Sequence, residues 1–148
     1  MSSNPIYAFF ATPKSFGPLI LRLLLASVFV YHGGQKAFGW FDGHGWAGTL
    51  KDFNGMGFSA GITVAVMLTE ILVAIAMFFG FLTRLAAVGV IVVMAGALHY
   101  VHAEHGWAAS EFPYALLMVA IALLFLGGGR LSLDRAISGQ LLPTVGGY

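Results

Sequence analysis

Four long apolar segments most constrain what this chain can fold into. They run over about 18–38, 61–82, 85–101 and 112–128. Each is close to the roughly 17–25 residues that an α-helix needs to cross a hydrocarbon core of about 30 Å. Backbone groups in lipid must bond within their own segment, and barrel strands would be shorter and would alternate apolar with polar residues. We therefore predict an all-α integral membrane four-helix bundle.

The composition agrees with a membrane protein and excludes several other classes. Only 9% of the 148 residues are charged and 59% are hydrophobic, whereas a soluble domain carries about 25% charge. The net charge of +1 and the lack of a Lys/Arg cluster exclude a basic nucleic-acid-binding protein. The chain has no cysteine, which excludes disulfides and thiol chemistry. We expect one membrane domain over residues 1–148, in contact with the lipid bilayer.

The distribution of basic residues predicts the orientation of the bundle. Four spans place both termini on one side of the membrane, and the opening segment, without a cleavage site, is predicted to be an amphipathic lead-in. The two sides hold unequal numbers of cations: the termini side has Lys14, Arg22, Arg84, Arg130 and Arg135, and the other only Lys36 and Lys51. The positive-inside bias therefore predicts cytoplasmic termini.

The connection between the first two spans is rich in glycine and aromatic residues. Trp40 and Trp46 in this connection, and Trp107 after the third span, all fall near the outer interface. Indole rings favour the headgroup zone, so one interpretation is a belt that anchors the protein. The other interpretation is a lid that covers a site beneath the connection.

Glu70 is the polar residue that most needs an explanation. It lies near the middle of the second span, where an ionisable side chain costs at least ~2.5–3.5 kcal/mol. We expect the carboxyl group to face the bundle interior, either paired or protonated. Arg22, about one turn inside the first span, is the candidate for a structural ion pair. A helix-packing role and a functional role for Glu70 both remain open.

The first span ends in "YHGGQK", which places polar groups at a depth close to that of Glu70. At ~1.5 Å per residue, His32 and Glu70 lie within about 5 Å of the same depth. His32 and Lys36 share one helix face. Gly33 and Gly34 allow another backbone, or a flat ligand, to approach closely. We predict that Glu70 meets His32 in a shared pocket.

The third span ends in a further group of histidines. His99 and His102 are three residues apart and share a face, with Glu104 and His105 just beyond. Imidazoles with a carboxylate suit a transition metal, although no HExxH motif is present. A quinone is the second chemistry, because its carbonyls accept hydrogen bonds and its reduction needs protons. A haem between His32 and His99 is a further alternative.

Taken in order, several segments resemble the DoxX family of small four-helix membrane proteins. They are "LRLLLASVFVYHGGQKAF", "LTEILVAIAMFFGFLTRLAA", "MAGALHY" and "GGGRLSLDR", in which "RLSLDR" also predicts a surface helix capped by Ser132. The resemblance rests on Arg22, His32, Gly33, Lys36, Glu70, Gly80, Arg84, His99, Ser132 and Asp134. It implies a bacterial or archaeal cytoplasmic (inner) membrane, and relatives that act in thiosulfate:quinone oxidoreduction or in oxidoreductase assemblies against oxidative stress.

These observations lead to a first hypothesis and two alternatives. In the first, the chain is a membrane subunit of a quinone-linked oxidoreductase system that binds quinone near the outer leaflet. Glu70 and His32 relay protons, and Lys36, His99 and Gly33 bind the quinone. Without a flavin motif or cluster-binding cysteines, it needs a partner redox protein or a larger membrane complex, and it can form a homo-oligomer. The alternatives are a structural or assembly subunit without a redox site and a small-solute transporter.

Overall fold

The computed structural model describes residues 5–101 and 105–141, which contain seven helices. Four of them are long and apolar enough to cross a membrane, which confirms the predicted four-helix membrane protein. The helices are α1 Pro5–Phe10, α2 Gly17–Phe38, α3 Gly45–Gly55, α4 Ala60–Phe79, α5 Thr83–Tyr100, α6 Gly106–Leu126 and α7 Leu133–Leu141.

Two helix boundaries differ from the predicted ones. The second span ends at Phe79 rather than near 82, because Gly80 adopts a left-handed conformation (φ 64°) that ends α4. The fourth span begins at Gly106 rather than near 112. Its first turns contain Ala108, Ala109 and Glu111, which favour a helix without being apolar enough to signal a span.

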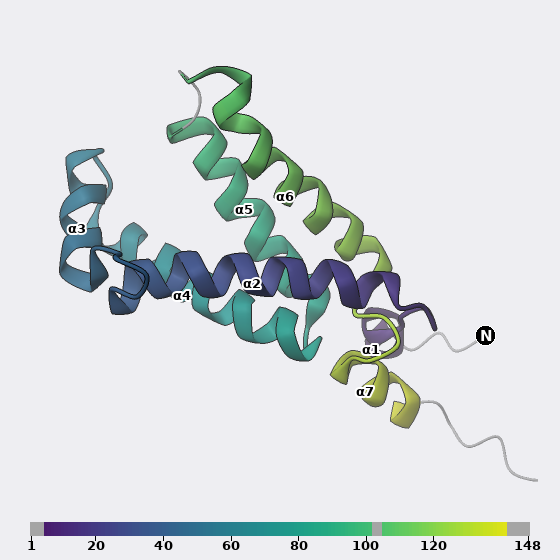
Figure 1. The fold of residues 1–148 in the computed structure, drawn as a ribbon. Helices are drawn as coiled ribbons and strands as arrows, with labels where there is room; N and C mark the ends of the chain where they lie inside the picture. Colours follow the sequence, from purple (N-terminus) through teal and green to yellow (C-terminus); the bar gives the residue numbers. More distant parts are fainter. Residues whose placement is uncertain (1–4, 102–104, 142–148) are drawn as a thin grey trace, which may run out of the picture.

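The spanning helices pack as two antiparallel pairs. Helix α2 packs along α4, α5 packs along α6, and α4 also contacts α5. Figure 1 shows the α5–α6 pair crossing α2 and inclining away from it toward the C-terminal end of α5. The shared core is made by Leu25, Ala26, Phe29, Val73, Ala74, Met77, Ala86, Ala87, Val90, Leu116, Ala120 and Leu123.

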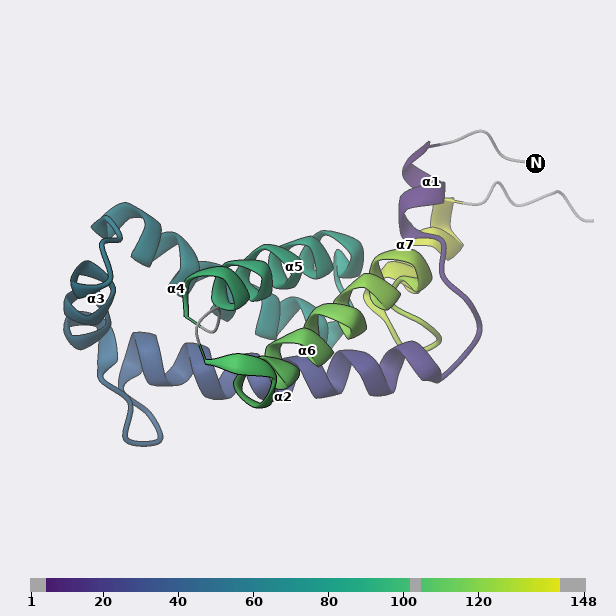
Figure 2. The same ribbon diagram turned by 90° about the horizontal axis from the view of Figure 1, so that it is seen from above.

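The three short helices lie at the two ends of the bundle. Helices α1 and α7, the first and last helices of the described chain, contact each other at what we call the termini end (Figures 1 and 2). Helix α3 crosses the opposite end, which we call the loop end (Figure 1). The predicted surface helix is confirmed as α7, with Ser132 Oγ accepting a hydrogen bond from the Arg135 N–H. That the termini end faces the cytoplasm stays a prediction.

Helix α3 was not predicted, and it bears on both interpretations of the tryptophan-rich connection. Trp40, Trp46 and Trp107 are all exposed, as a headgroup belt requires. Thr49 on α3 is buried and donates a hydrogen bond to the Lys36 carbonyl over 3.1 Å. Helix α3 is therefore attached to the last turn of α2, as a lid would be.

Asp134 of α7 caps the first turn of α5. Its carboxylate accepts hydrogen bonds from the N–H groups of Leu82 (2.7 Å) and Thr83 (2.9 Å), and its side chain is buried. These N–H groups have no partner within the helix itself. The cap joins the C-terminal helix to the α4–α5 turn.

We expect Asp134→Ala to lower the free energy of unfolding by about 1–2 kcal/mol, because loss of a capping side chain has effects of this size. Thermal unfolding in mild detergent would measure the change. Glu111→Ala, at an exposed position of α6, is the control and should leave the midpoint near that of the wild type. Equal midpoints for both variants would show that the cap contributes nothing.

Candidate functional site

The centre of the candidate site is an ion pair between α2 and α4. The Lys36 ammonium lies 2.8 Å from both carboxylate oxygens of Glu70. Glu70 is only 3% exposed, which confirms that its carboxyl group faces the bundle interior. The Lys36 side chain is 24% exposed. The pair therefore has a buried acidic side and a partly accessible basic side.

A glycine allows the two helices to approach at this pair. A Cβ atom on Gly33 would lie 3.4 Å from Glu70 Cβ and 3.5 Å from the Ile71 nitrogen. The close approach expected at Gly33 is thus made by the backbone of α4. Gly34 is covered in turn by the ring of Trp40, which a Cβ atom there would meet at 2.7 Å.

His32 lies one helical turn before Lys36, but it is not the partner of Glu70. Its ring is half-buried and contacts Tyr31 edge-on, with ring centroids 5.3 Å apart. Within the described part of the chain, His32 makes no hydrogen bond. The prediction that Glu70 contacts His32 is therefore wrong. The longer Lys36 side chain reaches the carboxylate instead.

Arg22, the candidate for a structural ion pair, does not pair with Glu70, whose partner is Lys36. The Arg22 side chain is fully buried, and its guanidinium donates to the carbonyls of Gly128 (2.8 Å) and Met77 (2.7 Å). It also donates to the carbonyls of Phe78 and Leu131. The last carbonyls of a helix lack intrahelical donors, so those at the end of α4 attract this cation. Arg22 therefore belongs to the termini end.

The histidines at the end of α5 are not joined to the Lys36–Glu70 pair. His99 is exposed, and its ring contacts that of Tyr100. No hydrogen bond or ion pair links His99 to α2 or α4 within residues 5–101 and 105–141. In the same residues, no three His, Asp or Glu side chains gather as a metal site would require. His102 and Glu104 lie outside the described residues.

The ion pair leaves one hydrogen-bond donor free for other chemistry. An ammonium group has three N–H donors, and two point to the Glu70 oxygens. Because Lys36 is partly accessible, the third can bind a carbonyl oxygen that arrives beside α2. The pairing of Lys36 with Glu70 was missed from the sequence, although the similar calculated depths of Glu70 and His32, one turn before Lys36, were a signal for it. No sequence signal indicated the contact from Thr49.

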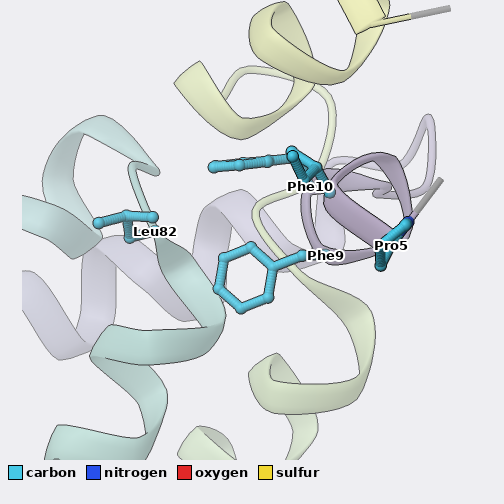
Figure 3. Close-up of a pocket in the computed structure, with 5 residues that line it drawn as sticks. Pro5, Phe9, Phe10 and Leu82 are labelled. Carbon is cyan, nitrogen blue, oxygen red and sulfur yellow. The ribbon is translucent and has the colours of Figure 1, made fainter.

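Two grooves lie at the termini end, away from the ion pair. One, of about 410 Å³, is apolar and lies between α1 and the α4–α5 turn. Figure 3 shows Phe9 directed toward Leu82, with Phe10 and Pro5 on α1. The other, of about 560 Å³, is lined by residues of α7 and its preceding turn together with Phe79. Neither groove is lined by Lys36 or Glu70.

Comparison with known proteins gives a family and two relatives. The sequence model of the DoxX family matches residues 17–103. A Bacillus subtilis (strain 168) protein named "Putative oxidoreductase CatD" is 30% identical over 124 residues, 82% of this chain and 88% of the relative. An uncharacterised protein of Haemophilus influenzae (strain ATCC 51907 / DSM 11121 / KW20 / Rd) is 32% identical over 135 residues, 85% of each chain. No solved structure matches.

Proposed function

The chain belongs to the DoxX family of multi-pass membrane proteins, and from that premise we propose that it is the membrane subunit of a quinone-linked oxidoreductase system. The observation that carries the proposal is the buried Lys36–Glu70 pair with its free ammonium donor. The printed name of the Bacillus subtilis relative supports an oxidoreductase role. The setting we propose is the cytoplasmic membrane of a bacterium or archaeon.

Lys36 is the proposed contact with the quinone. Its third N–H donates to a quinone carbonyl, while Glu70 holds the ammonium in place. When bound, the quinone would accept two electrons and two protons, and it is soluble in the bilayer. A quinone ring that enters from the bilayer would meet the exposed part of the Lys36 side chain.

Glu70 and His32 are the proposed proton-carrying groups. Glu70 takes or gives a proton at a carboxylate oxygen beside the Lys36 ammonium. The His32 ring has two nitrogens without a bonded partner in the described residues, so it can pass a proton toward the loop end. His99 is exposed at the end of α5 and Gly33 is covered by α4, so neither residue is a proposed quinone contact.

Electrons must come from another protein in this proposal. The chain has no cysteine for an iron–sulfur cluster, and its described residues hold no metal-binding cluster. A partner redox protein, or a larger membrane complex in which copies of this chain assemble, would supply them. That partner would approach the bundle from a membrane surface.

An assembly subunit without a redox site is the second candidate function. Four hydrogen bonds from Arg22 and two from Lys36 join α2 to α4 and to the segment between α6 and α7. Three measurements on detergent-purified protein distinguish the two functions. They are the absorbance spectrum, the metal content and the content of bound lipid-soluble ligands in an organic extract. An extract that contains quinone supports the first, and one that contains none favours the second.

We expect His32→Gln to slow quinone-coupled proton transfer at least about tenfold, since positioned acid–base groups contribute 10²–10⁴-fold. Folding should be unchanged, because the His32 ring has no hydrogen bond to lose within the described chain. Proton uptake during quinone reduction, in vesicles that contain the protein and its host membrane partners, would measure the rate. His105→Gln, at an exposed position just before α6, is the matched control. An unchanged rate in the His32 variant would remove this residue from the mechanism.

A further inference from the structure

The second groove at the termini end is lined by both arginines and apolar side chains. The arginines are Arg130 and Arg135. Phe79, Leu131 and Leu133 line it as well, and all three are exposed hydrophobic side chains. The volume of this groove is about 560 Å³. A ligand that fills it therefore needs an anionic part and an apolar part.

The two arginines of this groove differ from the other arginines at the same end. Arg22 donates to four backbone carbonyls. Arg84 donates to the carbonyls of Phe9 and Ala11, at the end of α1 and just after it, and to those of Leu124 and Phe125 in α6. The Arg130 guanidinium lies over the face of Phe16, 4.9 Å from the ring centroid, and donates no hydrogen bond to the described residues. Neither Arg130 nor Arg135 forms an ion pair in the described residues.

The one acidic side chain close in sequence is already engaged. Both oxygens of Asp134 accept N–H groups of the α4–α5 turn, and the side chain is buried. The two guanidinium groups therefore keep their donors for an anion from outside. Arginine presents a planar fork of donors that matches a phosphate group.

The position of the groove relative to the membrane indicates which kind of anion it binds. Phe79 is the last residue of a spanning helix, so the groove lies where the hydrocarbon core meets the headgroup zone. The positive-inside asymmetry predicts that this leaflet is the cytoplasmic one, whose anionic lipids attract basic residues next to the membrane. A phospholipid brings a phosphate and an acyl chain together at this depth.

We propose that Arg130 and Arg135 bind the headgroup phosphate of an anionic phospholipid, whose acyl chain lies against Phe79, Leu131 and Leu133. The site is separate from the Lys36–Glu70 pair and does not depend on the quinone proposal. It ties α7, and with it the cap on α5, to the lipid of one leaflet.

The test is a titration of detergent-purified protein with phosphatidylglycerol, read by native mass spectrometry. Each cationic side chain near an anionic lipid contributes about fivefold in affinity. We therefore expect the affinity of Arg130→Gln/Arg135→Gln to fall roughly 30-fold. Lys14→Gln is the matched control, because Lys14 lies at the same end but does not line the groove. Its affinity should equal that of the wild type within the error of the titration.

Three results would overturn the proposal. They are equal affinities of the wild type and the double variant, equal binding of phosphatidylglycerol and zwitterionic phosphatidylcholine, and displacement of the lipid by millimolar inorganic phosphate, which would show a site for the free anion. If the double variant does not fold, Arg135→Gln alone decides the question. Its side chain has no hydrogen bond or ion pair in the described residues, so a fivefold loss is expected and no loss contradicts the site.

Discussion

Arg22→Met is expected to lower the free energy of unfolding by at least ~3 kcal/mol. Each buried carbonyl left without a donor costs about 1–3 kcal/mol, and this guanidinium serves four carbonyls. Two of them end α4, and the other two lie in the segment between α6 and α7. The variant should therefore loosen the termini end as a unit. Unfolding followed by tryptophan fluorescence in mild detergent would show a midpoint lower by about 10 °C.

A graded variant identifies the cause of that loss. Arg22→Lys keeps the charge but offers three donors on one atom instead of a planar fork, so its midpoint should lie between those of the wild type and Arg22→Met. Lys14→Gln, an exposed substitution at the same end, should have no effect. A midpoint of Arg22→Met close to the wild-type value would contradict the role given to these hydrogen bonds.

The Lys36–Glu70 pair should behave very differently when one partner or both are replaced. Lys36→Met leaves a carboxyl group only 3% exposed without its cation, and breaking a buried pair in this way costs about 3–5 kcal/mol. Glu70→Gln should cost less, because the Lys36 side chain is 24% exposed and can reach toward the interface. The double variant Lys36→Met/Glu70→Leu should regain most of the loss, since apolar replacements of buried pairs are often close to neutral.

A double-mutant cycle measures this coupling directly. Unfolding free energies of the four proteins, obtained under the same detergent conditions, give the interaction energy of the pair. We expect a coupling of about 2–3 kcal/mol, in the upper part of the range for contacting residues. Additive losses in the two single variants would mean that the 2.8 Å contacts contribute nothing to folding.

The sequence was sufficient to predict the four spans because hydrophobic length is a local property. It was less reliable at the ends of the spans, where a left-handed glycine or a polar first turn decides the boundary. Gly80 shows why. A Cβ atom there would meet both Arg22 and Ser132 at 2.6 Å, so the end of α4 depends on contacts made by residues far away in the chain.

The candidate site could be predicted in its position but not in its pairing. Depth along the helices brought Glu70 and the end of the first span together. The choice between His32, Lys36 and Arg22 as partner depends on helix rotation and on side-chain reach, which residue counting does not provide. Arg22 also had competing acceptors, because the carbonyls at the end of α4 lie closer to its depth than Glu70 does.

Binding of quinone at the Lys36–Glu70 pair can be measured by extracting the purified protein with organic solvent. Wild-type protein and Lys36→Met/Glu70→Leu, which should be similarly stable, would be purified in parallel in mild detergent and their quinone content quantified by chromatography. If the pair binds quinone, the wild-type extract contains quinone and the extract of the double variant contains at least about tenfold less. Equal quinone in both, or none in the wild type, would contradict quinone binding at the pair.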